Sequence, residues 1–191
     1  FRTRDMRNLV GEMGIGHCRY PTAGNARSHE EAQPFYVNAP YGIVLGHNGN
    51  LTNADSLQKT MYESDLRHIN TDSDSEILLN VFAHELQKNS TGLNVSADQI
   101  FKAISGLHGR VHGAFACVAM IPGFGVIGFR DPWGIRPLVI GKRQNKHSYD
   151  WAIASESVAL QGLGFEVERD VGPGECVIVK VDGELLSQIC S

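Results

Sequence analysis

Two stretches in the middle of the chain repeat apolar residues at helical spacing. After Ser73 the apolar positions are 77, 78, 81, 82 and 86, and Ser73 with Glu76 matches a capping box at the helix start. After Ser96, whose box partner is Gln99, they are 100, 101, 104 and 107. The pattern predicts two amphipathic helices, one reaching residue 88, that pack on a sheet through their apolar faces.

The second half of the chain changes to short apolar runs that are separated by turn residues, such as Pro122-Gly123, Pro173-Gly174 and Asp182-Gly183. The predicted strands cover residues 114–120, 125–130, 138–142, 151–155, 167–170 and 175–181. Because most connections are too short for a parallel crossover, the sheet should be largely antiparallel. No linker divides the chain, so we predict a single α/β domain over residues 1–191, with its helices segregated from consecutive strands.

The first half contains shorter apolar runs. Residues 34–37 and 41–47 are predicted to form paired strands around an Asn-Ala-Pro turn, and residues 13–17 a further short strand. Asn53 is a suitable N-cap for a helix from Ala54 to about Ser64. This half therefore contributes both strands and a helix to the domain.

Two familiar patterns in the chain are not expected to bind a ligand. Residues 123–128 match the glycine spacing of dinucleotide-binding loops, but a strand follows them instead of a helix, which favours a hairpin. His108 and His112 are four residues apart, but they lack the helical frame and the neighbouring ligands of a zinc site. We interpret them as solvated or turn histidines and predict no metal site.

The composition is that of an ordinary globular protein, with 42% hydrophobic and 20% charged residues. A formal net charge of −4 gives no basic surface for nucleic acid or an anionic membrane, so we expect neither as a partner. No apolar run has the length of a transmembrane helix, and the first residues lack the apolar core of a signal peptide. The four cysteines show no C-x-x-C spacing. These features predict a cytoplasmic protein with reduced thiols.

Two segments set polar side chains beside residues that break regular structure. In residues 17–24, Arg19, Tyr20 and Thr22 lie next to a proline and a glycine, which is typical of a loop that holds a ligand. Asn48 and Gly49 pair a side-chain amide with an accessible backbone N–H, as an oxyanion hole requires. The alternative for the second segment is a β-hairpin, because Asn-Gly is a favoured two-residue turn.

Two further segments have both a structural and a functional interpretation. The acidic residues at positions 72, 74 and 76 suit a helix start, but one aspartate could instead pair with the ammonium group of a ligand. Residues 131–138 match a type I turn, yet Arg130, Trp133 and Arg136 exceed what a turn needs and suit a contact with another domain.

Together these segments resemble the N-terminal glutaminase domain of the amidophosphoribosyltransferase family, which opens purine synthesis. The resemblance lies in residues 16–24, 31–35, 46–51, 70–76 and 129–138. It implies the N-terminal-nucleophile hydrolase fold, which is a four-layer αββα sandwich with mostly antiparallel sheets. It also implies hydrolysis of glutamine to supply ammonia for the synthesis of 5-phosphoribosylamine.

The resemblance gives roles to individual residues. Arg19 would bind the α-carboxylate of glutamine and Asp74 its α-ammonium group. Asn48 and the N–H of Gly49 would form the oxyanion hole, and Tyr20 and Thr22 would belong to a loop that closes over the substrate. No cofactor or metal is expected in this span, whereas Mg²⁺ is expected in the phosphoribosyltransferase domain. The implied partners are glutamine, that domain of the same parent chain and further copies of the protein, as a homo-oligomer.

One departure from the family pattern concerns the nucleophile. The family uses an N-terminal cysteine, whose thiol attacks the amide and whose α-amino group acts as the base, but this sequence starts at Phe1. Cys18 is no substitute, because it lies inside the substrate loop and has no free α-amino group. We therefore expect a piece of a longer enzyme that is inactive by itself.

Two other interpretations of the sequence stay open. One is the glutaminase domain of another class II amidotransferase, such as glucosamine-6-phosphate synthase or asparagine synthetase. The other is a non-catalytic amino-acid-binding module, which would explain the missing nucleophile. The residues upstream of Phe1 distinguish that module from an enzyme, because a cysteine after the initiator Met would restore the nucleophile.

Overall fold

A computed structural model of the chain describes residues 2–18, 31–146 and 148–191. Its larger sheet has six strands, in the spatial order β1 (Phe35–Val37), β2 (Ile43–Leu51), β3 (Gly113–Ile121), β4 (Gly125–Arg130), β8 (Glu175–Lys180) and β9 (Leu185–Ile189). Its smaller sheet has the order β6 (Tyr149–Ala154), β5 (Val139–Gln144) and β7 (Glu166–Asp170). All the described strand pairs are antiparallel, as predicted.

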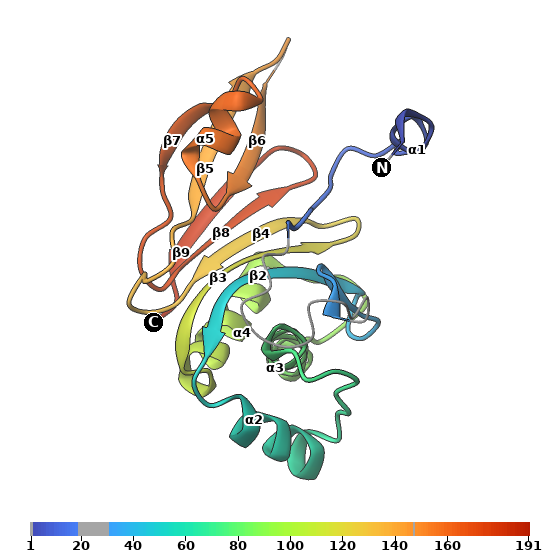
Figure 1. The fold of residues 1–191 in the computed structure, drawn as a ribbon, viewed down its shortest axis with the longest axis vertical. Helices are drawn as coiled ribbons and strands as arrows, with labels where there is room; N and C mark the ends of the chain where they lie inside the picture. The colour runs from blue at the N-terminus through green and yellow to red at the C-terminus, as the bar shows by residue number, and fades with distance from the viewer. Residues whose placement is uncertain (1, 19–30, 147) are drawn as a thin grey trace.

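Helices cover the outer side of each sheet (Figure 1). The larger sheet carries α3 (Asp74–Asn89) and α4 (Ala97–Arg110), and the smaller one carries α5 (Ser157–Gly162). Two more helices lie at the margins, α1 (Thr3–Arg7) and α2 (Ala54–Thr60), and a π-helical turn over Met61–Asp65 follows α2. The order helix, sheet, sheet, helix confirms the four-layer αββα sandwich.

Two hydrophobic cores of unequal size hold the layers together. The larger core lies between the larger sheet and α3 and α4, and it contains Phe82, Phe115 and Phe129. The smaller one lies between the sheets and consists of Ala116, Leu138, Val171 and Val177, with Ile153 against it. Gly128 lets the sheets approach here, because a Cβ at this position would lie 3.1 Å from Ile153.

The starts of the two main helices differ from one another. At α4 the capping box of Ser96 and Gln99 is present, as predicted. At α3 the predicted box is wrong, since the Ser73 side chain accepts from Ser75 N instead. The buried Glu76 carboxylate accepts from the backbone N–H groups of Asn70 and Thr71, at 2.9 and 2.8 Å. It therefore fastens the preceding loop to the helix and is not available for the cap.

The prediction for the helix after Asn53 is correct in position but wrong about the cap. Asn53 stands at the N-cap of α2 and its side chain makes no cap hydrogen bond. Its amide donates to Arg110 O, and its oxygen accepts from His112 N. The side chain satisfies the backbone at the end of α4, where helices leave carbonyl groups unpaired.

Most strand predictions are confirmed within one or two residues, and residues 123–128 belong to the β3–β4 hairpin. The predicted strand at 13–17 is wrong, because no described strand pairs with this segment. Three elements were not predicted, namely α1, α5 and β9.

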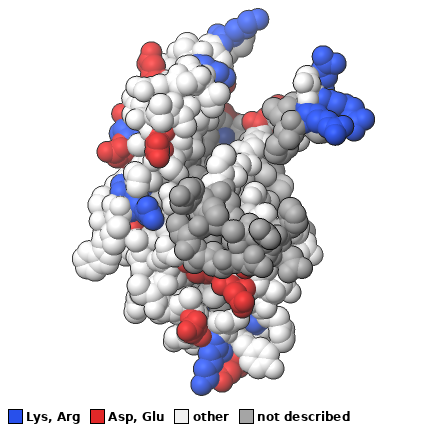
Figure 2. Space-filling model, in the orientation of Figure 1, with Lys and Arg blue, Asp and Glu red and all other residues white. Residues whose placement is uncertain are grey.

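Charged side chains are scattered over the face seen in Figure 2, apart from a basic group at the projecting α1. Among the described helices, none combines the length and apolar character needed to cross a bilayer.

Candidate active site

A cavity of about 830 Å³ opens where the two sheets meet. On the side of the larger sheet its walls come from β2, β3 and the start of α3. On the opposite side they come from Arg136, Leu138, the end of β6 and the residues that lead into α5. The cavity therefore combines segments that are far apart in the sequence, as is common for sites between packed layers.

Asn48 and Gly49 lie on the cavity wall, in the middle of β2. They pair with Ala116 and Phe115 of β3, so the hairpin interpretation is wrong. A type I′ turn needs positive φ at both residues, and here only Gly49 has it, at 150°. A Cβ at Gly49 would lie 1.9 Å from Ala114 O, so only glycine fits.

Asp74 is the first residue of α3, which confirms that the acidic segment starts a helix, and its side chain also lines the cavity. Its Oδ2 accepts from Leu51 N at 3.0 Å, which fixes the carboxylate beside β2, and 24% of its side chain is exposed. Three other described carboxylates line the cavity, those of Glu31, Asp72 and Glu156. Among the described lining residues, Arg136 alone is Lys or Arg. The cavity therefore favours a ligand that carries a positive group.

A buried polar network lies beneath Asn48. Gln33 Oε1 accepts from His47 N at 2.6 Å, and Gln33 Nε2 donates to Ser75 Oγ at 3.0 Å. His47 Nδ1 lies 3.0 Å from the same Ser75 Oγ and 3.8 Å from Asp74 Oδ1. These contacts connect the start of α3 with β2, and so they hold Asp74 in place relative to Asn48 and Gly49.

His47 is neutral at physiological pH. Burial lowers its pKa from 6.5 to about 4, although Asp74 raises it, and the charges of His17 and Arg136 lower it further. Its Nε2 is buried and has no hydrogen-bond partner within the described part of the chain. Unprotonated His47 can accept or donate one hydrogen bond without adding a positive charge to the site.

The structure describes only some of the other residues of the predicted substrate loop. Arg19, Tyr20 and Thr22 lie outside the described residues, whereas the exposed Cys18 lines the cavity. The cavity also contains polar residues to which the sequence analysis gave no role in the site, among them Gln33, His47, Ser75 and Arg136. All four stand in the segments that carry the family resemblance, which was the available signal.

The segment at 131–138 contains the predicted turn, in which Gly134 N donates to Asp131 O at 3.0 Å.

The interpretation of His108 as a solvated or turn residue is wrong. It lies on α4, is partly buried, and its Nε2 lies 3.0 Å from Arg130 O. His112 is exposed just beyond the helix. Within the described ranges, no group of three or more His, Cys, Asp or Glu residues could hold a metal ion.

Comparison with known families gives one matching family model, described as a glutamine amidotransferase domain, over residues 22–162. The chain is 56% identical over 191 residues to an amidophosphoribosyltransferase of Pseudomonas aeruginosa. It is also 56% identical over 192 residues to that of Escherichia coli. Each alignment covers the whole of this chain and 38% of the relative, so the chain spans well under half the length of these relatives.

Solved structures agree with the sequence relatives. The glutamine phosphoribosylpyrophosphate (PRPP) amidotransferase of B. subtilis, complexed with ADP and GMP, superposes with a TM-score of 0.69 at 32% identity. That match covers 92% of this chain and 34% of the other. A structure described as the allosteric regulatory enzyme of purine biosynthesis gives a TM-score of 0.71 at 32% identity and the same coverage.

Proposed function

This chain belongs to the glutamine amidotransferase domain family, and we propose that it is the glutamine-hydrolysing part of an amidophosphoribosyltransferase. In the complete enzyme, the amide nitrogen of glutamine would be released as ammonia and would replace the pyrophosphate of PRPP to give 5-phosphoribosylamine. The names of relatives that are 56% identical over the whole chain support this assignment.

The observation that carries the proposal is the meeting of Asn48, Gly49 and Asp74 in one cavity. Attack of a thiolate on the amide carbon of glutamine moves negative charge onto the carbonyl oxygen. The side-chain amide of Asn48 and the N–H of Gly49 would donate hydrogen bonds to that oxygen. The strand fixes the backbone of both residues before the substrate arrives, so little reorganisation would be needed as the charge develops.

Substrate recognition would depend on opposite charges at the two ends of glutamine. Asp74, held by Leu51 N, would accept the α-ammonium group, and the acidic walls of the cavity favour the same orientation. Arg19 would bind the α-carboxylate through its two-pronged guanidinium, while Tyr20 and Thr22 would close over the ligand.

Parts of the parent chain outside this sequence would complete the enzyme. They would supply the cysteine nucleophile, and the phosphoribosyltransferase domain with its Mg²⁺ would consume the ammonia. We also propose a homo-oligomer in the cytoplasm.

The Asp74→Asn variant of the complete enzyme tests the proposal. Removal of the charge should raise the KM for glutamine by roughly tenfold or more, since a charge-assisted hydrogen bond is lost. The ammonia-dependent reaction should be unchanged, because it does not use the cavity.

The matched control is Asp98→Asn, which removes a carboxylate from the first turn of α4, away from the cavity. If both variants raised the KM equally, or if Asp74→Asn reduced both reactions together, Asp74 would be structural and the binding assignment would be wrong. This chain alone, without the upstream cysteine, should release no ammonia from glutamine above the blank.

A further inference from the structure

The loop between β4 and β5 presents two large apolar side chains to solvent. Trp133 is 78% exposed and Ile135 is 60% exposed. The corner that contains this loop, at the left of Figure 2, shows neither acidic nor basic side chains at its tip. A tryptophan and an isoleucine exposed together on one loop form a patch of the kind that binds another protein surface.

The backbone beneath these side chains is held firmly. The fully buried Asp131 accepts from the N–H groups of Phe115, Trp133 and Ile135, at 3.2, 2.9 and 3.1 Å. The guanidinium of Arg130 donates to the carbonyls of Gly134, Arg136 and Val171. Such a loop loses little conformational entropy when a partner covers it, so it is preorganised for binding.

The end of the sequence lies against the base of the same loop (Figure 1). Gly174 N donates to Asp131 O at 2.9 Å, and a Cβ on Gly174 would lie 3.6 Å from Pro132 Cα and 1.9 Å from Ser191 Oγ. The alignments with the two bacterial relatives cover the whole of this chain but only 38% of each relative. A segment that continues beyond Ser191 would therefore start next to Trp133 and Ile135.

We propose that Trp133 and Ile135 form the docking surface for the part of the parent chain that follows Ser191. This proposal rests on one part of the proposed function, namely that the chain is part of a longer, glutamine-dependent enzyme. The covering segment would offer an apolar pocket to the indole. A tryptophan that a partner covers is a typical centre of such a contact.

Hydroxyl-radical footprinting of the complete enzyme tests the proposal, with mass spectrometry to measure the oxidation rate of each side chain in the native and the urea-unfolded protein. Trp133 should be oxidised about tenfold more slowly in the native enzyme, as expected for a side chain at the centre of an interface. Tyr36, which is 62% exposed on the edge strand β1, is the matched control and should change by less than about threefold.

Equal protection of Trp133 and Tyr36 would overturn the proposal. Protection of Trp133 that disappears on dilution would also overturn it, because a second copy would then be the occupant. As a second measurement, the variant Trp133→Ser with Ile135→Ser should lower the Tm of the complete enzyme by several degrees, while Tyr36→Ser should leave it unchanged. Footprinting requires no turnover, so failure of the proposed glutaminase activity would be recorded separately in an ammonia assay of the same sample.

Discussion

Gly49 has no side chain at a place where a side chain could not fit. Its φ is 150°, and Ala114 O lies only 1.9 Å from the position that a Cβ would occupy, so every other residue type is excluded. The dipeptide Asn-Gly has the same local pattern in a turn and in this strand, so local sequence could not decide between them. Pairing with β3, which comes much later in the chain, decided the outcome.

A variant of Asn48 tests the oxyanion role at this strand position. Asn48→Ala in the complete enzyme should reduce the glutamine-dependent kcat about a hundredfold with little change in KM, because the lost donor acts as the charge develops. The ammonia-dependent rate of the same variant is the control. A kcat within about twofold of the parent enzyme would leave Asn48 with no role in the chemistry.

His47 should make stability depend on pH. Its pKa is about 4 in the fold and 6.5 in the unfolded chain, so the unfolded state binds more protons as the pH falls between these values. The stability contributed by neutral His47 is fully present above pH 6.5 and is lost as the pH falls towards 4, by about 3 kcal/mol in total.

Urea denaturation at a series of pH values, with the parent protein and His47→Gln side by side, measures this effect. The glutamine variant should lose less stability between pH 6.5 and 4. Parallel curves for the two proteins would show that His47 is not the group responsible.

The sequence brought Asn48, Gly49 and Asp74 into one predicted site, and the cavity contains all three. The network of Gln33, His47 and Ser75 could not be found in the same way. Their hydrogen bonds join three separate segments, and no spacing along the chain indicates which polar side chains will be buried together.

At the scale of elements, long periodic segments were predictable and short ones were not. The two long helices α3 and α4 have continuous apolar faces, whereas α5 has only six residues and one buried side chain, Leu160. The unpredicted edge strand β9 is mostly exposed, so its residues show no alternation between buried and exposed positions. Such short elements form because a neighbouring strand or sheet is present.

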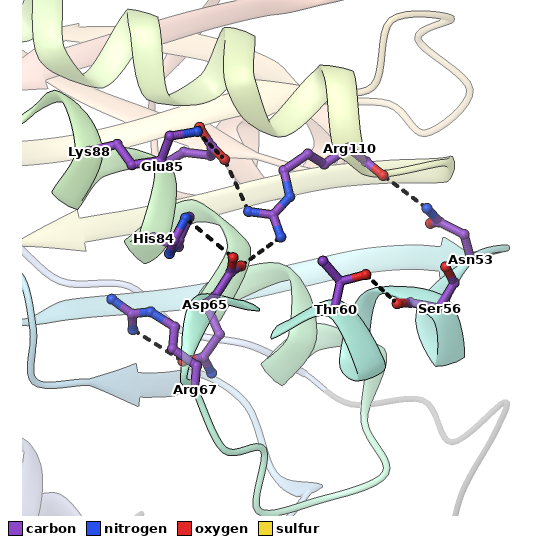
Figure 3. A network of polar contacts seen from close by, with 10 residues as sticks. Asn53, Ser56, Thr60, Asp65, Arg67, His84, Glu85, Lys88 and Arg110 are labelled. Carbon is purple, nitrogen blue, oxygen red and sulfur yellow. Dashed lines mark hydrogen bonds and ion pairs between the residues drawn. The ribbon is translucent and has the colours of Figure 1, made fainter. Parts of the chain in front are cut away.

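A charged network joins α3, α4 and the π-helical turn (Figure 3). Arg110 donates to Asp65 Oδ2 at 2.6 Å and to Glu85 Oε1 at 3.0 Å, and both carboxylates are largely buried. Lys88 also pairs with Glu85, and His84 with Asp65. Arg110 therefore neutralises two carboxylates that water reaches poorly.

Arg110→Met should lower the free energy of unfolding by about 2 to 3 kcal/mol, since two buried carboxylates lose their main partner. The matched control is Lys88→Met, which removes an exposed partner of Glu85 and should cost less than about 0.5 kcal/mol. Urea midpoints of both variants give the comparison. Similar losses in the two would show that burial adds nothing to the Arg110 pairs.

At the scale of the whole molecule, the two cores should differ in local stability. The small core between the sheets consists of Ala116, Leu138, Val171 and Val177, while the large core fills the space between the larger sheet and its helices. Native-state hydrogen exchange should give amides of β5 an opening free energy about 2 kcal/mol or more below that of β3. Equal values for the two strands would mean that the sheets separate only on global unfolding.

The cavity lies next to the small core between the two sheets, and its walls belong to both sheets. A ligand that contacts both walls stabilises the packing of the two sheets by mass action, and this stabilisation grows with ligand concentration. If the ligand is glutamine, as proposed, the glutamine concentration sets the free energy that is needed to separate the two sheets. Without bound substrate, the two sheets would then separate more often than in the substrate complex.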